Sequence, residues 1–171
     1  MHLMIDLETL ATTPDAAILT IGACKFDPRS NDIDATFYER IQLDTQENYD
    51  RTINEDTLAW WSKQDKKVQE DAFGEGNDRI DLKDAMKKLY TFGLGTKNVW
   101  SHGSIFDVII IENICQSFQQ AVTWKFWEVR DTRTLFDIAD VSIRIEGKHN
   151  ALTDAMAQAK AVQQCYKKLM K

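Results

Sequence analysis

The chain has 171 residues, of which 43% are hydrophobic and 28% are charged, and this composition is ordinary for a globular domain. It carries 21 Lys and Arg against 27 Asp and Glu, a formal net charge of −6, which argues against passive binding of nucleic acid through a broad basic surface. The same charge is compatible with an enzyme whose acidic site holds cations, because bound ions reverse the local sign.

Three strands are predicted first, because apolar runs alternate with turn-forming segments. They cover residues 2–8, 16–26 and 35–43. Their short connections favour antiparallel pairing of neighbouring strands. A helix is predicted next at 53–64, with Asn54 or a neighbour as its N-cap.

The rest of the chain alternates between helical and strand-like patterns. Helices are predicted at about 81–92, 104–119, 131–140 and 149–170, strands at 97–103 and 122–129, and a loop at 73–79. A meander followed by this alternation predicts an α/β fold in which helices cover a mixed sheet. No repeat or linker divides the sequence, so we expect one domain over residues 1–171.

The three cysteines, Cys24, Cys115 and Cys165, are widely spaced in apolar contexts, which predicts buried free thiols in a reducing compartment. The first residues already read as a strand rather than as a leader. The longest apolar run, around "VIII", is far shorter than the roughly 20 residues of a membrane span. We therefore expect a cytoplasmic protein without membrane association.

Two acidic residues stand in the first predicted strand. Positions two apart in a strand point the same way, so Asp6 and Glu8 share a face with His2 and Met4. Two neighbouring carboxylates repel each other and lose hydration when they are buried. Such a pair needs a compensating partner.

Two later acids stand in equally unexpected positions. Asp107 falls on the apolar stripe of helix 104–119, and Asp154 lies at the edge of the apolar stripe of helix 149–170. Each alone is most simply a partnered polar side chain or an N-cap. Four core-facing acids together indicate hard divalent cations, which take oxygen ligands. Two such ions about 4 Å apart are a recurrent device for phosphodiester hydrolysis.

The segments "IDLET", "HGSIFD" and "HNALTD" together resemble the three motifs of the DEDDh branch of the DEDD exonuclease superfamily. That branch has D-x-E-T on its first strand, an Asp after an aromatic on a middle helix, and a late H-x-A-x-x-D. Within the superfamily, "LAWW", "WSHG" and "DTRTL" are most similar to phage DexA-type and exonuclease-VIII-like 3′–5′ exonucleases. His102 is a departure, since that group often has Asn before the glycine.

The resemblance implies a ribonuclease-H-like fold, with a mixed five-stranded sheet whose first three strands are antiparallel. It also implies removal of nucleotides from a 3′ end as nucleoside 5′-monophosphates. Two Mg²⁺ or Mn²⁺ ions would be held by Asp6, Glu8, Asp107 and Asp154. His149 would be the general base, a role that suits the ordinary pKa of histidine, about 6.5. Read without the resemblance, His149 simply begins a helix with Asn150 as N-cap.

Substrate contacts are assigned to Thr9, Leu10, Trp61, His102 and Phe106. The resemblance places Thr9 and Leu10 at the terminal nucleotide. Adjacent tryptophans on a helix point about 100° apart, so at least one of Trp60 and Trp61 belongs to the core, and the other is available to stack a base. We choose Trp61 for stacking. For His102 and Phe106, packing is the alternative role.

The expected partner is therefore a nucleic acid with a free 3′ end, single-stranded and preferably DNA. An exoribonuclease of the same branch is the alternative, since the four acids and His149 would serve both. A non-catalytic nucleic-acid-binding module is a further alternative. The acids are too dispersed for the contiguous loop of a structural calcium site. The sequence leaves open whether the protein forms a homodimer.

Overall fold

In a computed structural model, residues 1–74, 76, 78–143 and 149–170 are described. They form a six-stranded sheet with the order β4-β3-β2-β1-β5-β6. The strands are β1 His2–Thr9, β2 Ile18–Phe26, β3 Ile33–Ile41, β4 Arg79–Ile80, β5 Val99–Ser101 and β6 Val129–Asp131. The first three strands pair antiparallel, whereas β4, β5 and β6 run parallel to their neighbours, so the predicted mixed sheet is confirmed. The sheet has a sixth strand beyond the expected five because two-residue β4 pairs with β3.

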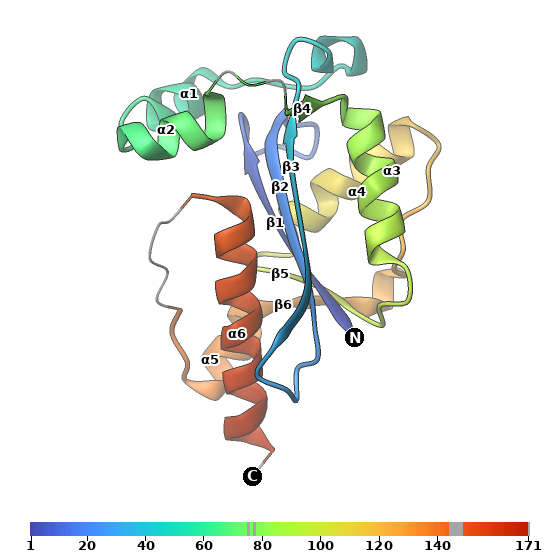
Figure 1. Cartoon of the computed structure of the whole chain (residues 1–171), viewed down its shortest axis with the longest axis vertical. Coiled ribbons are helices and arrows are strands. Elements are labelled where there is room, and N and C mark those ends of the chain that lie inside the picture. The colour runs from blue at the N-terminus through green and yellow to red at the C-terminus, as the bar shows by residue number, and fades with distance from the viewer. Residues whose placement is uncertain (75, 77, 144–148, 171) are drawn as a thin grey trace.

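Helices cover both faces of this sheet. They are η1 Gln46–Tyr49, α1 Glu55–Trp61, α2 Lys66–Phe73, α3 Leu82–Gly93, α4 Asp107–Ser117, η2 Phe126–Glu128, α5 Thr132–Ala139 and α6 Ala151–Leu169. Figure 1 shows the long strands nearly edge-on, with α5 and α6 on one side and α3 and α4 on the other. Within the part of the chain that the structure describes, no helix has the length and apolar character needed to cross a membrane.

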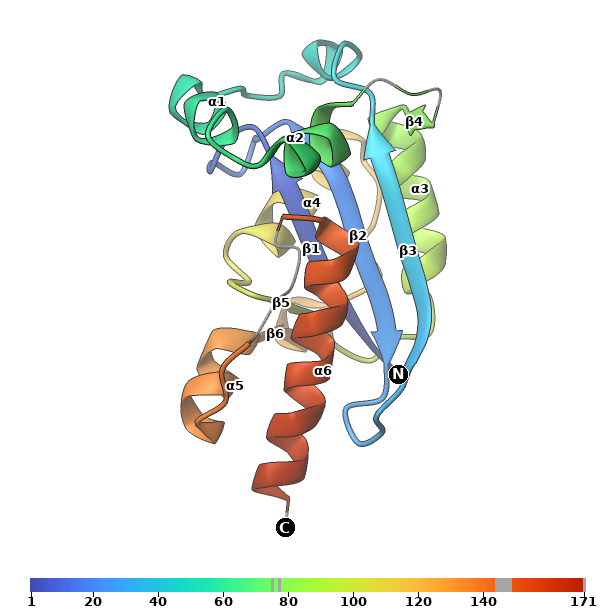
Figure 2. The ribbon, with the colours of Figure 1, turned by 60° about the vertical axis from the view of Figure 1, so that its left-hand side comes forward.

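Strand alternation explains how β1 separates two cores. Leu3, Ile5 and Leu7 are buried in a cluster with residues of α3 and α4. Met4 points the other way and is buried in a second cluster with residues of α5 and α6. Figure 2 shows α6 lying along β1 and β2 on that second face. Asp6 and Glu8 follow Met4 on the α6 side, and the face predicted from the sequence is therefore the one that α6 covers.

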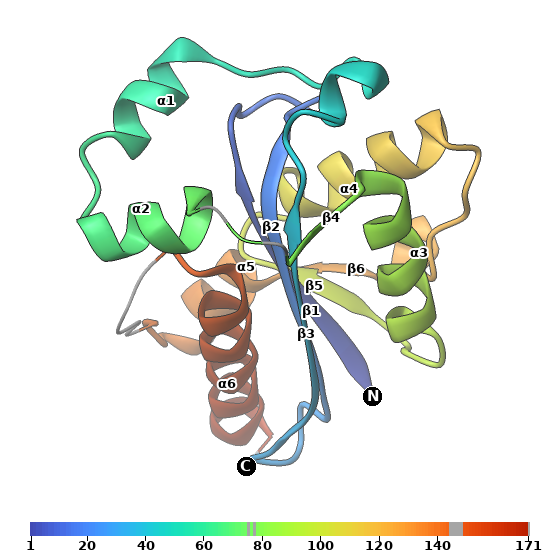
Figure 3. The same cartoon turned by 45° about the horizontal axis from the view of Figure 1, so that its top comes forward.

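The α1–α2 pair extends from the end of the sheet where β1 finishes (Figure 3). Leu10, just after β1, is fully buried in a third cluster with Trp61 of α1 and Ala72 of α2. The predicted N-cap is confirmed, since the Asn54 side chain accepts hydrogen bonds from the backbone N–H groups of Asp56 and Thr57. Helix α1 thus begins beside the acidic end of β1.

The strand predicted at 122–129 is wrong. The Lys125 N–H donates to the Glu128 carboxylate at 2.8 Å, which closes a turn around η2, and strand structure starts only at Val129. Of the three aromatic residues in this segment, Trp124 is buried, whereas Phe126 is 83% and Trp127 is 55% exposed. Helix α2 was not predicted, because few of its residues are apolar.

Candidate active site

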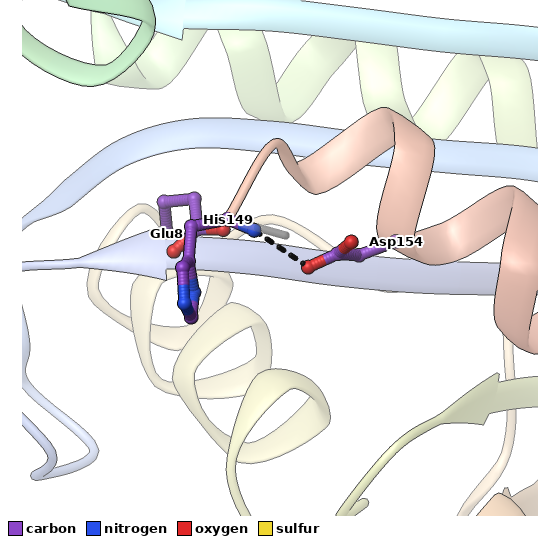
Figure 4. A group of neighbouring side chains, drawn as sticks. All are labelled: Glu8, His149 and Asp154. Carbon is purple, nitrogen blue, oxygen red and sulfur yellow. Dashed lines mark hydrogen bonds between the residues drawn. The ribbon is translucent and has the colours of Figure 1, made fainter. Parts of the chain in front are cut away.

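Three chemically active side chains meet at the end of β1. Glu8, His149 and Asp154 each offer one potential ligand atom, and these atoms all lie within 4.8 Å of one another. Figure 4 shows that Glu8 comes from β1, His149 from the segment just before α6, and Asp154 from the first turn of α6. Residues almost the whole chain apart are thus brought to one point.

A glycine lets α6 come this close to the sheet. Gly22 of β2 pairs with Asp6, and a Cβ built on Gly22 would lie 2.1 Å from the backbone carbon of Ala151. Any larger residue at position 22 would therefore push away the first turn of α6. That turn is fixed at its start by the Asn150 side chain, which accepts a hydrogen bond from the Thr153 N–H. Asn150 is the predicted N-cap, and it leaves His149 immediately outside the helix.

His149 is held in an uncommon backbone conformation. Its φ is 72°, in the left-handed region that residues other than glycine rarely occupy. Its N–H donates to Asp154 Oδ2 at 3.1 Å. Its ring lies edge-on to Trp60, with 4.9 Å between ring centroids, and 6.4 Å from the ring of Trp61. Backbone and ring are therefore both constrained, a pattern typical of functional positions.

Asp6 is oriented by a glutamine on α6. Gln158 is buried and its Nε2 donates to Asp6 Oδ1 at 2.7 Å. Gln158 lies one helical turn after Asp154, so both side chains face β1 from the same side of α6. This hydrogen bond fixes one oxygen of the Asp6 carboxylate.

Asp107 reaches the site around the edge of β1. Strand β5 pairs with β1 only at Leu3 and Met4, and beyond that point the Leu7 N–H donates to Asp107 Oδ1 at 3.0 Å. The carboxylate thus continues the hydrogen bonding that the shorter β5 does not supply. Asp107 is the first residue of α4 and is buried, as its place on the apolar stripe predicted.

Burial and the charges of neighbouring acids raise the pKa values of the carboxyl groups at this site. Desolvation, and next the charges of Asp107 and Glu8, raise the pKa of Asp6 well above its usual range. Desolvation, followed by the charges of Asp154 and Asp107, raises the pKa of Glu8 to about 8. Burial also raises the pKa of Asp107, against the hydrogen bond from Leu7. The charges of Asp107, Glu8 and Asp154 thus all act on the Asp6 carboxyl, and the assignment of these four acids as metal ligands stays a prediction.

This donor set fits a hard divalent cation. Carboxylate oxygens are the ligands that Mg²⁺ and Mn²⁺ prefer, and an ion among them would replace repulsion by attraction. Without a cation, ionising the cluster is unfavourable in the folded protein. We therefore regard the end of β1 as a candidate metal centre.

A pocket of about 470 Å³ opens beside the cluster. Its walls include Glu8 and Thr9 of β1, Trp60 and Trp61 of α1, and Phe106 just before α4. A pocket lined by aromatic rings and by a carboxylate suits a flat, partly polar ligand. Three of the residues predicted to contact substrate, Thr9, Trp61 and Phe106, thus line this pocket. Their contact with substrate stays a prediction.

The choice of Trp61 as a stacking residue needs correction. Trp61 is 3% exposed and its indole N–H donates to the Thr9 carbonyl at 2.9 Å, so its ring belongs to the core beneath the pocket. Trp60 is 42% exposed and is the tryptophan available to a base. Leu10 is also a core residue and does not line the pocket. The Thr9 hydroxyl donates to the Ala11 carbonyl.

His102 has its ring directed toward α5 rather than into the pocket. Nδ1 lies 2.8 Å from Thr132 Oγ1, and the ring packs 5.8 Å from the ring of Phe136. Desolvation and then the charge of Arg133 lower the pKa of His102. The packing role is therefore the one that its surroundings favour.

Sequence reasoning missed Gln158, Gly22 and the importance of Trp60. Gln158 carried a signal, because it is a polar residue four positions after Asp154 on a largely apolar helix face. No sequence signal marked the close approach of α6 to Gly22, because it depends on where α6 crosses β2. The ring contact between Trp60 and His149 likewise depends on tertiary structure.

The chain belongs to the family described as 3′–5′ exoribonuclease Rv2179c-like domains, which matches residues 1–166. It is a 3′–5′ exonuclease, a hydrolase of phosphodiester bonds, and the predicted DEDDh resemblance is confirmed. An "Exodeoxyribonuclease" of Enterobacteria phage T4 is 22% identical, over 77% of this chain and 68% of the phage protein.

Two solved structures show the same fold. The nuclease domain of 3′hExo, a DEDDh family member bound to rAMP, is 15% identical with a TM-score of 0.59, over 97% of this chain and 91% of that one. The zinc-bound complex of E. coli exonuclease I with single-stranded DNA is 11% identical with a TM-score of 0.71. That alignment covers 99% of this chain but only 41% of the exonuclease I chain.

Proposed function

We propose that this exonuclease removes single nucleotides from the 3′ end of a single-stranded nucleic acid, with divalent cations held by Asp6, Glu8, Asp107 and Asp154. The observation that carries the proposal is the meeting of buried acids and His149 at the end of β1. Acids from three separate elements contribute, although their burial and repulsion are unfavourable in a protein without cations.

Mg²⁺ or Mn²⁺ fits the all-oxygen ligand set better than a softer metal does. When bound, two such ions would lower the pKa of an attacking water and stabilise the leaving 3′ oxygen. The zinc in the exonuclease I complex supports a metal site in proteins of this fold. Gln158 would orient Asp6 toward a cation by fixing its Oδ1.

His149 is assigned as the general base. One of its ring nitrogens lies within 4.8 Å of a carboxylate oxygen of Glu8 and of one of Asp154, so a water at the acids is within its reach. Trp60 packs edge-on against the ring and restricts its orientation. His149 would accept the proton of the attacking water as the phosphodiester bond breaks.

The pocket beside Glu8 would hold the terminal nucleoside, with Trp60 and Phe106 as aromatic walls. The product would be a nucleoside 5′-monophosphate, which the rAMP complex of 3′hExo supports. The phage T4 relative supports DNA as the substrate. The family description favours RNA as the second candidate. The buried free thiols of Cys24, Cys115 and Cys165 support action in the reducing cytoplasm.

The test uses matched single-stranded DNA and RNA, labelled at the 5′ end, with Mn²⁺, Mg²⁺ or EDTA. We expect a ladder that shortens from the 3′ end only with metal, and release of 5′-monophosphates. Asp6→Ala should abolish the ladder, whereas Asp34→Ala, which removes an exposed acid on β3, should not. Absence of a ladder on both substrates, from folded protein with metal, would contradict the proposal.

A further inference from the structure

A positively charged side chain, that of Arg133, lies beside the loop that leads to Asp107. Arg133 is an exposed residue in the first turn of α5, within the segment "DTRTL". Its Nε–H donates to the carbonyl of His102 at 3.2 Å. Its charge is among those that act on the Asp107 carboxyl. Arg133 is thus close to the loop that leads into motif residue Asp107.

Sheet topology explains this position. Strands β1, β5 and β6 run parallel, so their C-terminal ends lie at the same end of the sheet. Helix α4 starts with Asp107 after β5, and α5 starts with Thr132 directly after β6 (Figure 2). In open α/β sheets, ligands bind in the crevice outside the carboxyl ends of strands. Arg133 therefore stands at the end of the sheet where the substrate is expected.

The surrounding contacts hold Arg133 against the loop before α4. The Asp131 carboxylate accepts the Ser104 N–H at 2.6 Å and the Arg133 N–H at 2.9 Å. Gly103 has φ +112°, and a Cβ there would lie 3.6 Å from Arg133 Nε. The glycine thus allows the chain to turn while the arginine side chain lies beside it.

The remaining donors of this guanidinium have no partner among the residues that the structure describes. Among the described residues, Arg133 takes part in no ion pair, and its Nη groups make no hydrogen bond. By contrast, the Nη groups of Arg40, Arg51 and Arg79 donate to protein oxygens. A planar guanidinium with free donors matches phosphate oxygens in geometry and in charge.

We propose that Arg133 binds a backbone phosphate of the nucleic-acid strand, next to the scissile phosphate on the Asp107 side of the site. This inference rests on the proposed function. Arg133 donates to the His102 carbonyl, in the loop that leads to Asp107. It is not a member of the Glu8–His149–Asp154 cluster, where the scissile bond would be.

The test compares Arg133→Gln with Arg130→Gln, whose exposed guanidinium instead donates to the carbonyls of Trp127 and Val129. Turnover of single-stranded DNA is measured over a series of NaCl concentrations. We expect KM of Arg133→Gln to rise about tenfold or more, which corresponds to loss of one charge-assisted hydrogen bond, with kcat almost unchanged. The slope of log(1/KM) against log[salt] should become shallower by about 0.7, the loss of one phosphate contact.

Three additional measurements separate strand binding from an indirect effect on Asp107. The p-nitrophenyl ester of thymidine 5′-monophosphate has a single phosphate, so Arg133→Gln should turn it over like the wild type. Arg133→Lys should restore the salt slope, and Arg133→Glu should raise KM further. Unchanged KM and slope in Arg133→Gln would overturn the inference, and so would an equal loss on the ester. If the wild-type protein produced no metal-dependent ladder, the proposed function would be overturned together with this inference.

Discussion

The two halves of one face of β1 differ sharply although the same helix, α6, covers both. In the N-terminal half, Met4 is packed among apolar side chains and His2 accepts a hydrogen bond from the Trp100 indole at 2.9 Å. Burial, and next the charge of the N-terminus, lower the pKa of His2 to about 4, so the ring is neutral at physiological pH. The side chains of this half are packed or hydrogen-bonded within the protein, so they need no ligand.

In the C-terminal half, Asp6 and Glu8 stand where apolar side chains would be expected. Gln158 donates one hydrogen bond to Asp6, and the neighbouring charges are other carboxylates. On the described part of this face, the buried titratable group of one half is thus neutral, whereas the other half brings together two acids whose charged neighbours are also acidic. We attribute that difference to a function that supplies cations from outside.

The largest expected effect belongs to His149. His149→Ala should lower kcat by roughly 10²–10⁴, the usual contribution of a general base, while the melting temperature changes little. The side chain is half-buried, and its ring lies edge-on to Trp60, which is part of the pocket wall. Steady-state kinetics with saturating Mn²⁺ measures this loss.

His102→Asn is the matched control for His149→Ala. It removes a ring that packs on Phe136 and bonds Thr132, so it should lower stability more than turnover. If His149→Ala turned over like the wild type, or if both variants lost activity equally, the assignment of His149 would be wrong.

Gln158→Leu should have the next largest effect on activity. Removing a hydrogen bond to a metal-binding side chain commonly costs about 10–100-fold in metal affinity or activity. We expect a higher Mn²⁺ concentration for half-maximal activity, with Gln164→Leu, an exposed position on the same helix, as the control. Equal Mn²⁺ requirements in the two variants would show that Gln158 does not orient Asp6.

Gly22→Ala tests the close approach of α6 to strand β2. The added methyl would meet the backbone of Ala151 and must displace the start of α6. Overpacking of this kind costs about 1–3 kcal/mol, which corresponds to a fall of several degrees in melting temperature. Circular dichroism melts measure it, and a melting temperature equal to that of the wild type would contradict the packing described here.

The pH dependence of stability gives a smaller effect. In the unfolded chain Glu8 ionises around its ordinary pKa of 4.5, whereas in the folded protein its pKa is about 8. Between these values the folded state binds more protons, so stability in EDTA should fall as the pH rises. Glu8→Gln should flatten this dependence, and a stability that rose with pH over this window in EDTA would contradict it.

Much of this fold and site could be predicted from the sequence. The alternation in "HLMIDLET" placed Asp6 and Glu8 on one strand face, and the apolar stripe of α4 placed Asp107 toward the core. Local sequence could not show which tryptophan of α1 is buried, because both positions are consistent with an amphipathic helix. It also mistook "VTWKFWEV" for a strand, since a turn closed by Glu128 leaves Phe126 and Trp127 exposed.

The most direct test of the cation site is a pair of melting curves for the wild type and for Asp6→Asn, in EDTA and with Mn²⁺. If the Mn²⁺ concentration is about 100 times the Kd of the site, binding adds about 2.7 kcal/mol to the free energy of unfolding. For a chain of this length that corresponds to a rise of about 5–10 °C in the melting temperature of the wild type. Asp6→Asn should be more stable than the wild type in EDTA and should gain much less from Mn²⁺. An unchanged melting temperature of the wild type, or an equal gain in both proteins, would contradict a cation site at the end of β1.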